Sequence, residues 1–432
     1  MKLAHVAASL VLWTACRGEP DHHAARAADP KSGSDRASSV VPKLPRSESG
    51  DDELRIIDRQ IEIHRVKPDD IAQVIDLYLT RAGIRGDLED YQAALALTAT
   101  WLERSPDDLD AMKARVRALS RVHRFADARA ELALIKQRPK INAGEWQPLE
   151  ATIDEATGKL ALSLPEREQM AKMWPSPTNL TQLAGALGLE CKYDEALAVM
   201  PKAAAAVRDN SPVMLTWLLF QWGRLYEQKG EMAAARELYA AARDRMPGSL
   251  EAIVHLAQTM IATGDSAAAK PIVQAALAAD RHPELVALAA NLDQTALPLG
   301  SADGRAQVPA IGPEHKAALI AEARAGWERY LAALPEAFSD HAARFYLGVG
   351  GDPARALVLA QANLANRDTV EARELVVDAA LAAGAAAQAC AVVEPLRDPA
   401  LPHAARFKAW QALSRCGRTA DAERLAGDLG IK

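Results

Sequence analysis

Aromatic residues and cysteines are scarce in this 432-residue chain: aromatics make up 5% of it and cysteines number four. So few cysteines exclude a disulfide-built scaffold and a cysteine-rich metal protein. The chain is nevertheless 49% hydrophobic and rich in alanine, which has the best helix propensity and little bulk. This composition favours closely packed helices over a β-sandwich, and the length exceeds that of one compact domain.

An excess of positive charge is also lacking, because 51 Lys and Arg stand against 57 Asp and Glu. Without the basic footprint of a nucleic-acid binder, we expect no nucleic-acid partner. The motifs HExxH, GxxxxGKS/T, GxSxG and CxxC are missing. The glycine-rich stretch 348–355 follows no predicted strand, and the pair His22-His23 lies in a stretch predicted to be disordered. We therefore expect no enzyme, no cofactor and no metal site.

The N-terminus has the features of an export signal: Lys2 precedes an apolar run over residues 3–15. That run is shorter than the roughly 20 residues that span a bilayer. Thr14-Ala15-Cys16 resembles the lipobox of bacterial lipoproteins, although Trp13 stands where leucine is usual. The resemblance implies a signal peptide over 1–15 and a lipid anchor, palmitate included, on Cys16.

The residue after the cysteine bears on location. Arg17 rather than Asp follows Cys16, so the resemblance favours the outer membrane or periplasm of a bacterial cell envelope over the inner membrane. Two alternatives stay open, namely export without a lipid, and a cytosolic helix whose cysteine is incidental. Residues 16–50 are rich in Gly, Pro, Ser and charge, and are predicted to be a disordered tether about 30 Å in span.

A unit of 34 residues recurs along the rest of the chain. In residues 216–249 two helical patterns are joined at Gly230 and end at Pro247. The residues at packing positions are Leu219, Trp222, Gly223, Tyr226, Ala235, Tyr239 and Ala242. This order resembles the tetratricopeptide repeat, and residues 250–283 repeat it. The resemblance implies an all-α solenoid of antiparallel helix pairs with about eight or more repeats.

The small residue that opens each second helix marks the period. It falls at Ala94, Ala128, Ala196, Ala235, Ala269, Ala356, Ala389 and Ala422. Chance alignment in an alanine-rich chain is the alternative, but glycines and aromatics fall in the same phase. The unit between Ala128 and Ala196 is degenerate, because Leu162 occupies the small position and Pro165 follows.

Residues 297–315 interrupt the repeats with prolines and glycines and no periodicity, which predicts a hinge loop. We therefore expect a solenoid over 51–296 and a C-terminal helical block over 316–432. The two blocks form either one superhelix or two joined arms. In the second block, Cys390 and Cys416 are expected at the same end of the stack, where a disulfide and two buried free thiols are both open.

By resemblance, a partner binds the concave surface lined by the first helices. The candidate partner-binding residues are Lys113, Arg117, Arg121, Trp217, Phe220, Arg224, Val254 and Gln258. Lys113, Arg117 and Arg121 are spaced by four and form one basic stripe, which is either a solvated helix face or a site for an acidic peptide or lipid headgroups. Trp217 and Phe220 are expected to be accessible, unless packing buries them.

These features favour a non-catalytic, membrane-anchored scaffold or assembly factor that binds a protein or peptide. The alternatives are an accessory or regulatory subunit of an envelope enzyme or transport system, and a cytosolic adaptor. The sequence does not identify the partner.

The lipid anchor is tested by replacing Cys16 with alanine. We expect the wild-type chain to sediment with membranes and to incorporate labelled fatty acid, and the Cys16→Ala chain to do neither, because the acylated thiol is gone. If the variant fractionates like the wild type, the lipoprotein interpretation is wrong.

Overall fold

The computed structural model describes residues 39–47, 49–67, 70–292 and 313–431, and all regular secondary structure in this part of the chain is helical. The first helix is α1 (Gly50–His64). The helix pairs that follow are α2 (Ile71–Arg85) with α3 (Leu88–Arg104), α4 (Leu109–Arg121) with α5 (Phe125–Lys136), α6 (Gln147–Ala156) with α7 (Leu160–Met173), α8 (Pro177–Leu189) with α9 (Tyr193–Ala206), and α10 (Pro212–Lys229) with α11 (Met232–Arg245).

The second half continues the same way. Its pairs are α12 (Leu250–Ala262) with α13 (Ser266–Ala279), α14 (Pro283–Leu292) with α15 (Pro313–Ala333), α16 (Pro335–Leu347) with α17 (Pro353–Asn366), α18 (Val370–Ala382) with α19 (Ala386–Ala391), and α20 (His403–Arg415) with α21 (Thr419–Leu429). Two short 3₁₀ helices, η2 (Ala143–Glu145) and η3 (Glu394–Arg397), complete the fold. The chain is thus the all-α solenoid of helix pairs that the sequence predicts.

Small residues lie where the two helices of a pair cross. The predicted marker alanines are fully buried, except Ala422, which is 6% exposed. In the degenerate unit Leu162 is 63% exposed, and Ser163, one place later, is fully buried instead. The absence of a large side chain at these points lets the backbones approach closely.

A tight turn precedes each of these small residues except Ala94 by five positions. The residue there has a left-handed backbone, as at His123 (φ 57°), Gly158 (78°), Cys191 (57°), Gly230 (87°), Gly264 (80°), Gly351 (62°), Gly384 (73°) and Gly417 (84°). Glycine adopts this conformation without strain, so it is the usual choice at this position.

The predicted hinge does not divide the stack. Helix α14 ends just before residues 293–312 and α15 starts just after them, yet the two helices pack against each other as one pair. Helix α15 begins at Pro313, so it includes the last three residues of the predicted loop 297–315. The other residues of that loop lie outside the described residues. The two predicted blocks therefore form one continuous superhelix.

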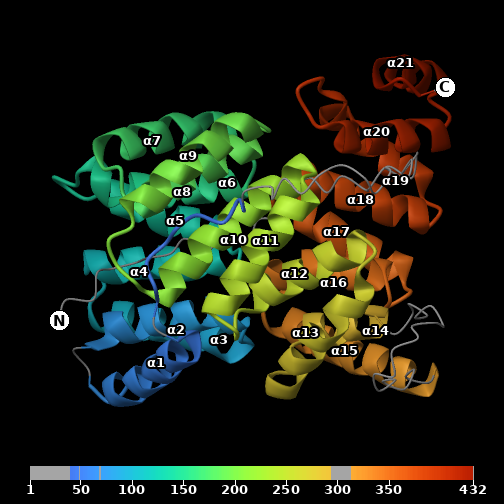
Figure 1. Ribbon diagram of the computed structural model, residues 1–432. Coiled ribbons are helices and arrows are strands. Elements are labelled where there is room, and N and C mark those ends of the chain that lie inside the picture. The colour runs from blue at the N-terminus through green and yellow to red at the C-terminus, as the bar shows by residue number, and fades with distance from the viewer. Residues whose placement is uncertain (1–38, 48, 68–69, 293–312, 432) are drawn as a thin grey trace.

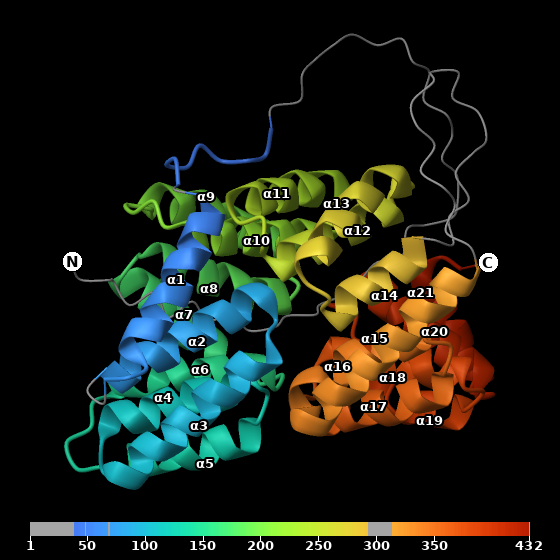
Figure 2. The same cartoon turned by 90° about the horizontal axis from the view of Figure 1, so that it is seen from below.

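The superhelix turns back on itself (Figures 1 and 2). We call α2–α7 the N-terminal arm and α15–α21 the C-terminal arm; α8–α14 join them. Figure 2 shows the two arms as columns that stand side by side below the joining helices. The rings of Tyr91 and Phe338 lie 6.4 Å apart across the two arms, and the Tyr330 hydroxyl donates to the carbonyl of Gly86. One hydrophobic core contains buried residues of both arms.

Part of the expected tether is packed onto the solenoid. Residues 39–47 lie against α11, where Ser39 Oγ donates to Glu237 and Arg245 donates to the carbonyl of Pro45. Val40 and Leu44 pack against the core of α8–α13. These apolar side chains explain why the described part of the segment is not disordered. The predicted signal peptide over 1–15 and residues 16–38 lie outside the described residues.

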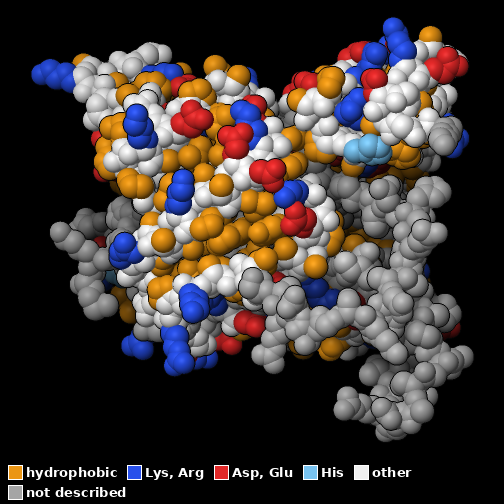
Figure 3. All heavy atoms as spheres, turned by 45° about the horizontal axis from the view of Figure 1, so that its top comes forward, with side chains coloured by type: hydrophobic (Ala, Val, Ile, Leu, Met, Phe, Trp, Pro, Cys, Tyr) orange, Lys and Arg blue, Asp and Glu red, His pale blue; other side chains and the backbone are white. Residues whose placement is uncertain are grey.

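Charges of both signs are mixed on the described part of the face drawn in Figure 3. Figure 3 shows one face on which apolar side chains gather across the middle and charges of both signs are dispersed, with the C-terminal helices projecting at the upper right. Within the described ranges, no helix has the length and apolarity needed to cross a bilayer.

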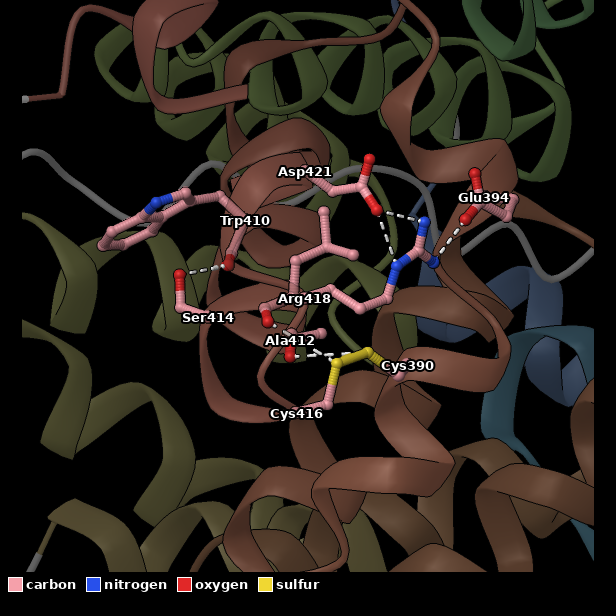
Figure 4. Close-up of a disulfide and its surroundings, with 9 residues drawn as sticks. Cys390, Glu394, Trp410, Ala412, Ser414, Cys416, Arg418 and Asp421 are labelled. Carbon is pink, nitrogen blue, oxygen red and sulfur yellow. Dashed lines mark hydrogen bonds and ion pairs between the residues drawn. A yellow bond between two sulfur atoms is a disulfide. The ribbon is translucent and has the colours of Figure 1, made fainter. Parts of the chain in front are cut away.

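Cys390 of α19 and Cys416, which follows α20, form a disulfide in the structure, with Cα atoms 6.3 Å apart (Figure 4). Beside it, Arg418 donates to Glu394 and Asp421, which ties η3 to α21. Helix α19 is short because the chain turns into η3, which contains Pro395. The bridge therefore joins the α20–α21 pair to the α18–α19 pair, whose second helix is short.

A thiol titration of the denatured Cys16→Ala chain tests this bridge. Without reductant we expect one thiol, that of Cys191, and three after reduction. Reduction should lower the stability of the last two pairs by about 3 kcal/mol, because it frees a loop of about 25 residues in the unfolded state. Three thiols before reduction would exclude the bridge.

The contact between the arms can be tested at Gly158. A Cβ atom there would lie 2.1 Å from the carbonyl oxygen of Asp368 in the other arm, whereas one at Gly230 would meet nothing within 4 Å. Both glycines have positive φ, so Gly230→Ala should cost about 1–2 kcal/mol from the backbone alone. Gly158→Ala should cost a further ~1–3 kcal/mol from the overlap.

Urea unfolding followed by circular dichroism measures both variants. Equal midpoints for Gly158→Ala and Gly230→Ala would mean that the arms do not touch at this point in solution.

Candidate partner-binding site

The candidate site lies on α10 and α12, the first helices of two adjacent pairs. Trp217, Phe220 and Arg224 are spaced by three and four residues and share one face of α10. They are buried, with 4%, 6% and 5% of their surface exposed; Val254 on α12 is buried and Gln258 half-buried. The two aromatic side chains are therefore not accessible. The Phe220 ring packs against Tyr239 of α11 and His255 of α12, and α1 packs on α10. Their role in binding stays a prediction.

The predicted basic stripe on α4 is paired with acidic residues. Lys113 Nζ lies 2.8 Å from both Asp110 and Glu145, and Arg117 lies 3.2 Å from Asp76. The third member, Arg121, is half-buried, and burial lowers the pKa of its guanidinium. The structure thus offers no row of unpaired cations at Lys113 and Arg117.

A chain of hydrogen bonds fixes the inner face of α10. Glu227 Oε2 accepts from the Tyr239 hydroxyl and lies 2.9 Å from Nδ1 of His255. Nε2 of His255 lies 3.5 Å from Arg224 Nη1, and the Phe220 ring packs edge-on against the imidazole at 5.1 Å. Three helices, α10, α11 and α12, therefore hold these side chains in one arrangement.

Several polar atoms on this face have no hydrogen-bond partner within the described part of the chain. They are Thr181 Oγ1 on α8, and Trp217 Nε1, Arg224 Nε and Nη2, and Gln228 Oε1 on α10. Each of these side chains is less than 9% exposed. A buried polar group without a partner costs about 1–3 kcal/mol, so an external hydrogen-bonding group would be stabilised here.

Charged groups of both arms meet near this face. Burial raises the pKa of Glu251, on α12, to about 7, although the charges of Arg224 and Arg121 oppose the shift. Because Glu251 is then only partly ionised at neutral pH, it compensates the two guanidinium groups incompletely. The face has an excess of hydrogen-bond donors and positive charge, which suits carbonyl or carboxylate oxygens.

A half-buried pair of charged side chains lies between α14 and α16. Burial alone would raise the pKa of Glu284, but the charge of His341, whose Nδ1 lies 3.3 Å away, outweighs burial and lowers it. Burial alone would lower the pKa of His341, but Asp340 and Glu284 raise it to about 9. The two side chains are therefore a charged pair at neutral pH.

The described ranges contain no group of three His, Cys, Asp or Glu side chains able to hold a metal ion. The groups that the sequence did not single out, Glu251 and Gln228, lie on the same helix faces as Trp217 and Arg224. The 34-residue step from Trp217 to Glu251 was the available signal.

A comparison with protein-family models supports the assignment of the repeat. Residues 226–292 match the family model of the tetratricopeptide repeat, and the chain contains such repeats. No curated protein matches the chain.

Solved structures of low identity are similar to the chain. One is the Cut9–Hcn1 hetero-tetramer of the APC/C, at 16% identity and a TM-score of 0.42, over 77% of this chain and 60% of that one. This chain thus spans less than two thirds of that relative. A tetratricopeptide repeat protein from Parabacteroides merdae matches at 15% identity and a TM-score of 0.37, over 65% of this chain and 98% of its own.

Proposed function

We propose that this protein is a non-catalytic scaffold or assembly factor that binds a protein partner through the inner face of α8, α10 and α12. Tetratricopeptide repeats are a protein-interaction fold. The matched residues 226–292 cover the end of α10 and all of α11, α12, α13 and α14. The observation that carries the proposal is the row of buried, unpartnered polar atoms on α8 and α10.

The hydrogen-bonding groups of that row limit the class of partner that can bind there. Trp217 Nε1 and the Arg224 guanidinium donate only, and the hydroxyl of Thr181 donates as well as accepts. Donors predominate, so an extended peptide segment that presents backbone carbonyls or an acidic side chain fits best.

The scaffold is further proposed to be anchored in a bacterial cell envelope, in the periplasm or at the outer membrane, by a lipid on Cys16. The support is the sequence of residues 1–16.

Thr181→Val tests the inner face, since valine keeps the shape and removes the hydroxyl. We expect the free chain to unfold at an equal or higher urea concentration, because a buried group without a partner is gone. Capture of the partner from detergent-solubilised envelope should fall about fivefold, the effect of one hydrogen bond of ~1 kcal/mol.

Thr98→Val is the matched control. Thr98 is also fully buried, but its hydroxyl donates to the carbonyl of Leu95 and accepts from Arg115. This variant should lose about 1 kcal/mol of stability and retain capture. If Thr181→Val instead loses stability and captures as much as the wild type, the inner face is not the binding site.

A further inference from the structure

His123 occupies a backbone position at which the other turns of this fold mostly have glycine. Its φ of 57° is left-handed, and it lies five residues before the buried Ala128, as Gly230 lies before Ala235. A non-glycine residue in this conformation is strained and persists when surrounding contacts compensate for it. Cys191, with φ 57°, is the other such residue in these turns.

The contacts that compensate His123 come from the opposite arm. Its carbonyl oxygen accepts from Asn366 Nδ2 at 2.9 Å, and its Nδ1 lies 3.2 Å from the carbonyl of Glu336 and 3.4 Å from Arg367 Nη1. These partners are 213 to 244 residues away in the sequence. The imidazole is 3% exposed and stacks on Phe125 of its own arm.

We propose that His123, Asn366, Arg367 and the Glu336 carbonyl form a clasp that holds the two arms together and so controls access to the inner face of α10. The inference deepens the proposed function, since it concerns the regulation of that same face. The residues of the clasp are separate from the residues of the inner face whose polar atoms have no partner within the described chain. Release of the clasp would let the arms separate and expose Trp217.

Charge at the clasp makes it sensitive to acid. Burial, and then the charges of Arg367 and His341, lower the pKa of His123 from 6.5 to about 3, and Asp340 opposes this shift. A histidine with a lowered pKa stabilises the closed form above pH 6.5. This contribution is lost as the pH falls from 6.5 toward 3, by roughly a factor of ten in the equilibrium per pH unit.

Other groups between the arms also titrate. Burial lowers the pKa of His282 to about 4, which adds to the effect of acid. Glu251 has a raised pKa, so its protonation favours the closed form at acid pH and opposes His123. The lowered pKa values of Glu284 and Asp340 keep them charged between pH 5 and 7. A variant of His123 is therefore needed to isolate the clasp.

The test uses the full chain without a partner and compares His123→Gly with Cys191→Gly. Both changes relieve a left-handed backbone, but only the first removes the side chain that reaches the other arm. The probe is hydroxyl-radical oxidation of Trp217, read by mass spectrometry, with Trp222 on the same helix as an internal reference. We expect oxidation of Trp217 at pH 7.5 to rise several-fold in His123→Gly and to match the wild type in Cys191→Gly.

Acid and a second variant complete the test. In the wild type, oxidation of Trp217 should rise between pH 7 and pH 5, and this rise should be smaller in His123→Gly. Asn366→Ala, which removes one bond from the opposite side, should raise oxidation at pH 7.5 in the same direction. The clasp is excluded if Trp217 is equally protected in all variants at both pH values, or if Trp222 and Trp217 become oxidised together.

The two proposals fail separately. Oxidation reports the clasp without any partner, and capture by Thr181→Val reports the binding face. Opening of the arms in His123→Gly without any change in partner capture would overturn the control of access, while leaving the scaffold to be judged by Thr181→Val.

Discussion

The fold depends on the geometry of the turn that joins the two helices of a pair. In most of the described helix pairs the chain reverses through a left-handed residue, and five positions later a small residue lets the second helix cross close to the first. Because the same reversal recurs about every 34 residues, each pair is rotated by a similar small amount relative to the previous one. The solenoid accumulates these rotations, and its curvature brings the first pairs back to the last.

Closure of the superhelix changes the environment of the side chains on its concave face. In an open solenoid, residues such as Trp217 and Arg224 would be hydrated, and their polar atoms would be satisfied by water. Here both side chains are buried, and Arg224 Nε and Trp217 Nε1 are left without partners in the described structure. The free energy of burying these groups opposes closure, whereas contacts such as Tyr91 with Phe338 favour it. The closed form is therefore a balance that a ligand or a charge can shift.

The sequence predicts the local part of this fold and not the distant part. The marker alanines could be located because packing of neighbouring helices repeats with a fixed period, and even the degenerate unit follows the rule with Gly158 and Ser163. Closure could not be predicted, because it depends on contacts between residues more than 200 positions apart, such as His123 with Asn366. Trp217 and Phe220 are buried as well, although the repeat pattern alone places them on an accessible surface.

One signal for closure was nevertheless local. The turn position is glycine at Gly158, Gly230 and Gly264, and a β-carbon there has a cost, so a histidine at 123 needs a compensating contact. Within its own arm, His123 stacks on Phe125 and its N–H donates to Ser120, but its carbonyl oxygen and Nδ1 have partners in the other arm. A strained residue at a turn position that is usually glycine thus indicates where a repeat also contacts a repeat that is distant in the sequence. In this solenoid that position couples the shape of the whole superhelix to the accessibility of its inner face.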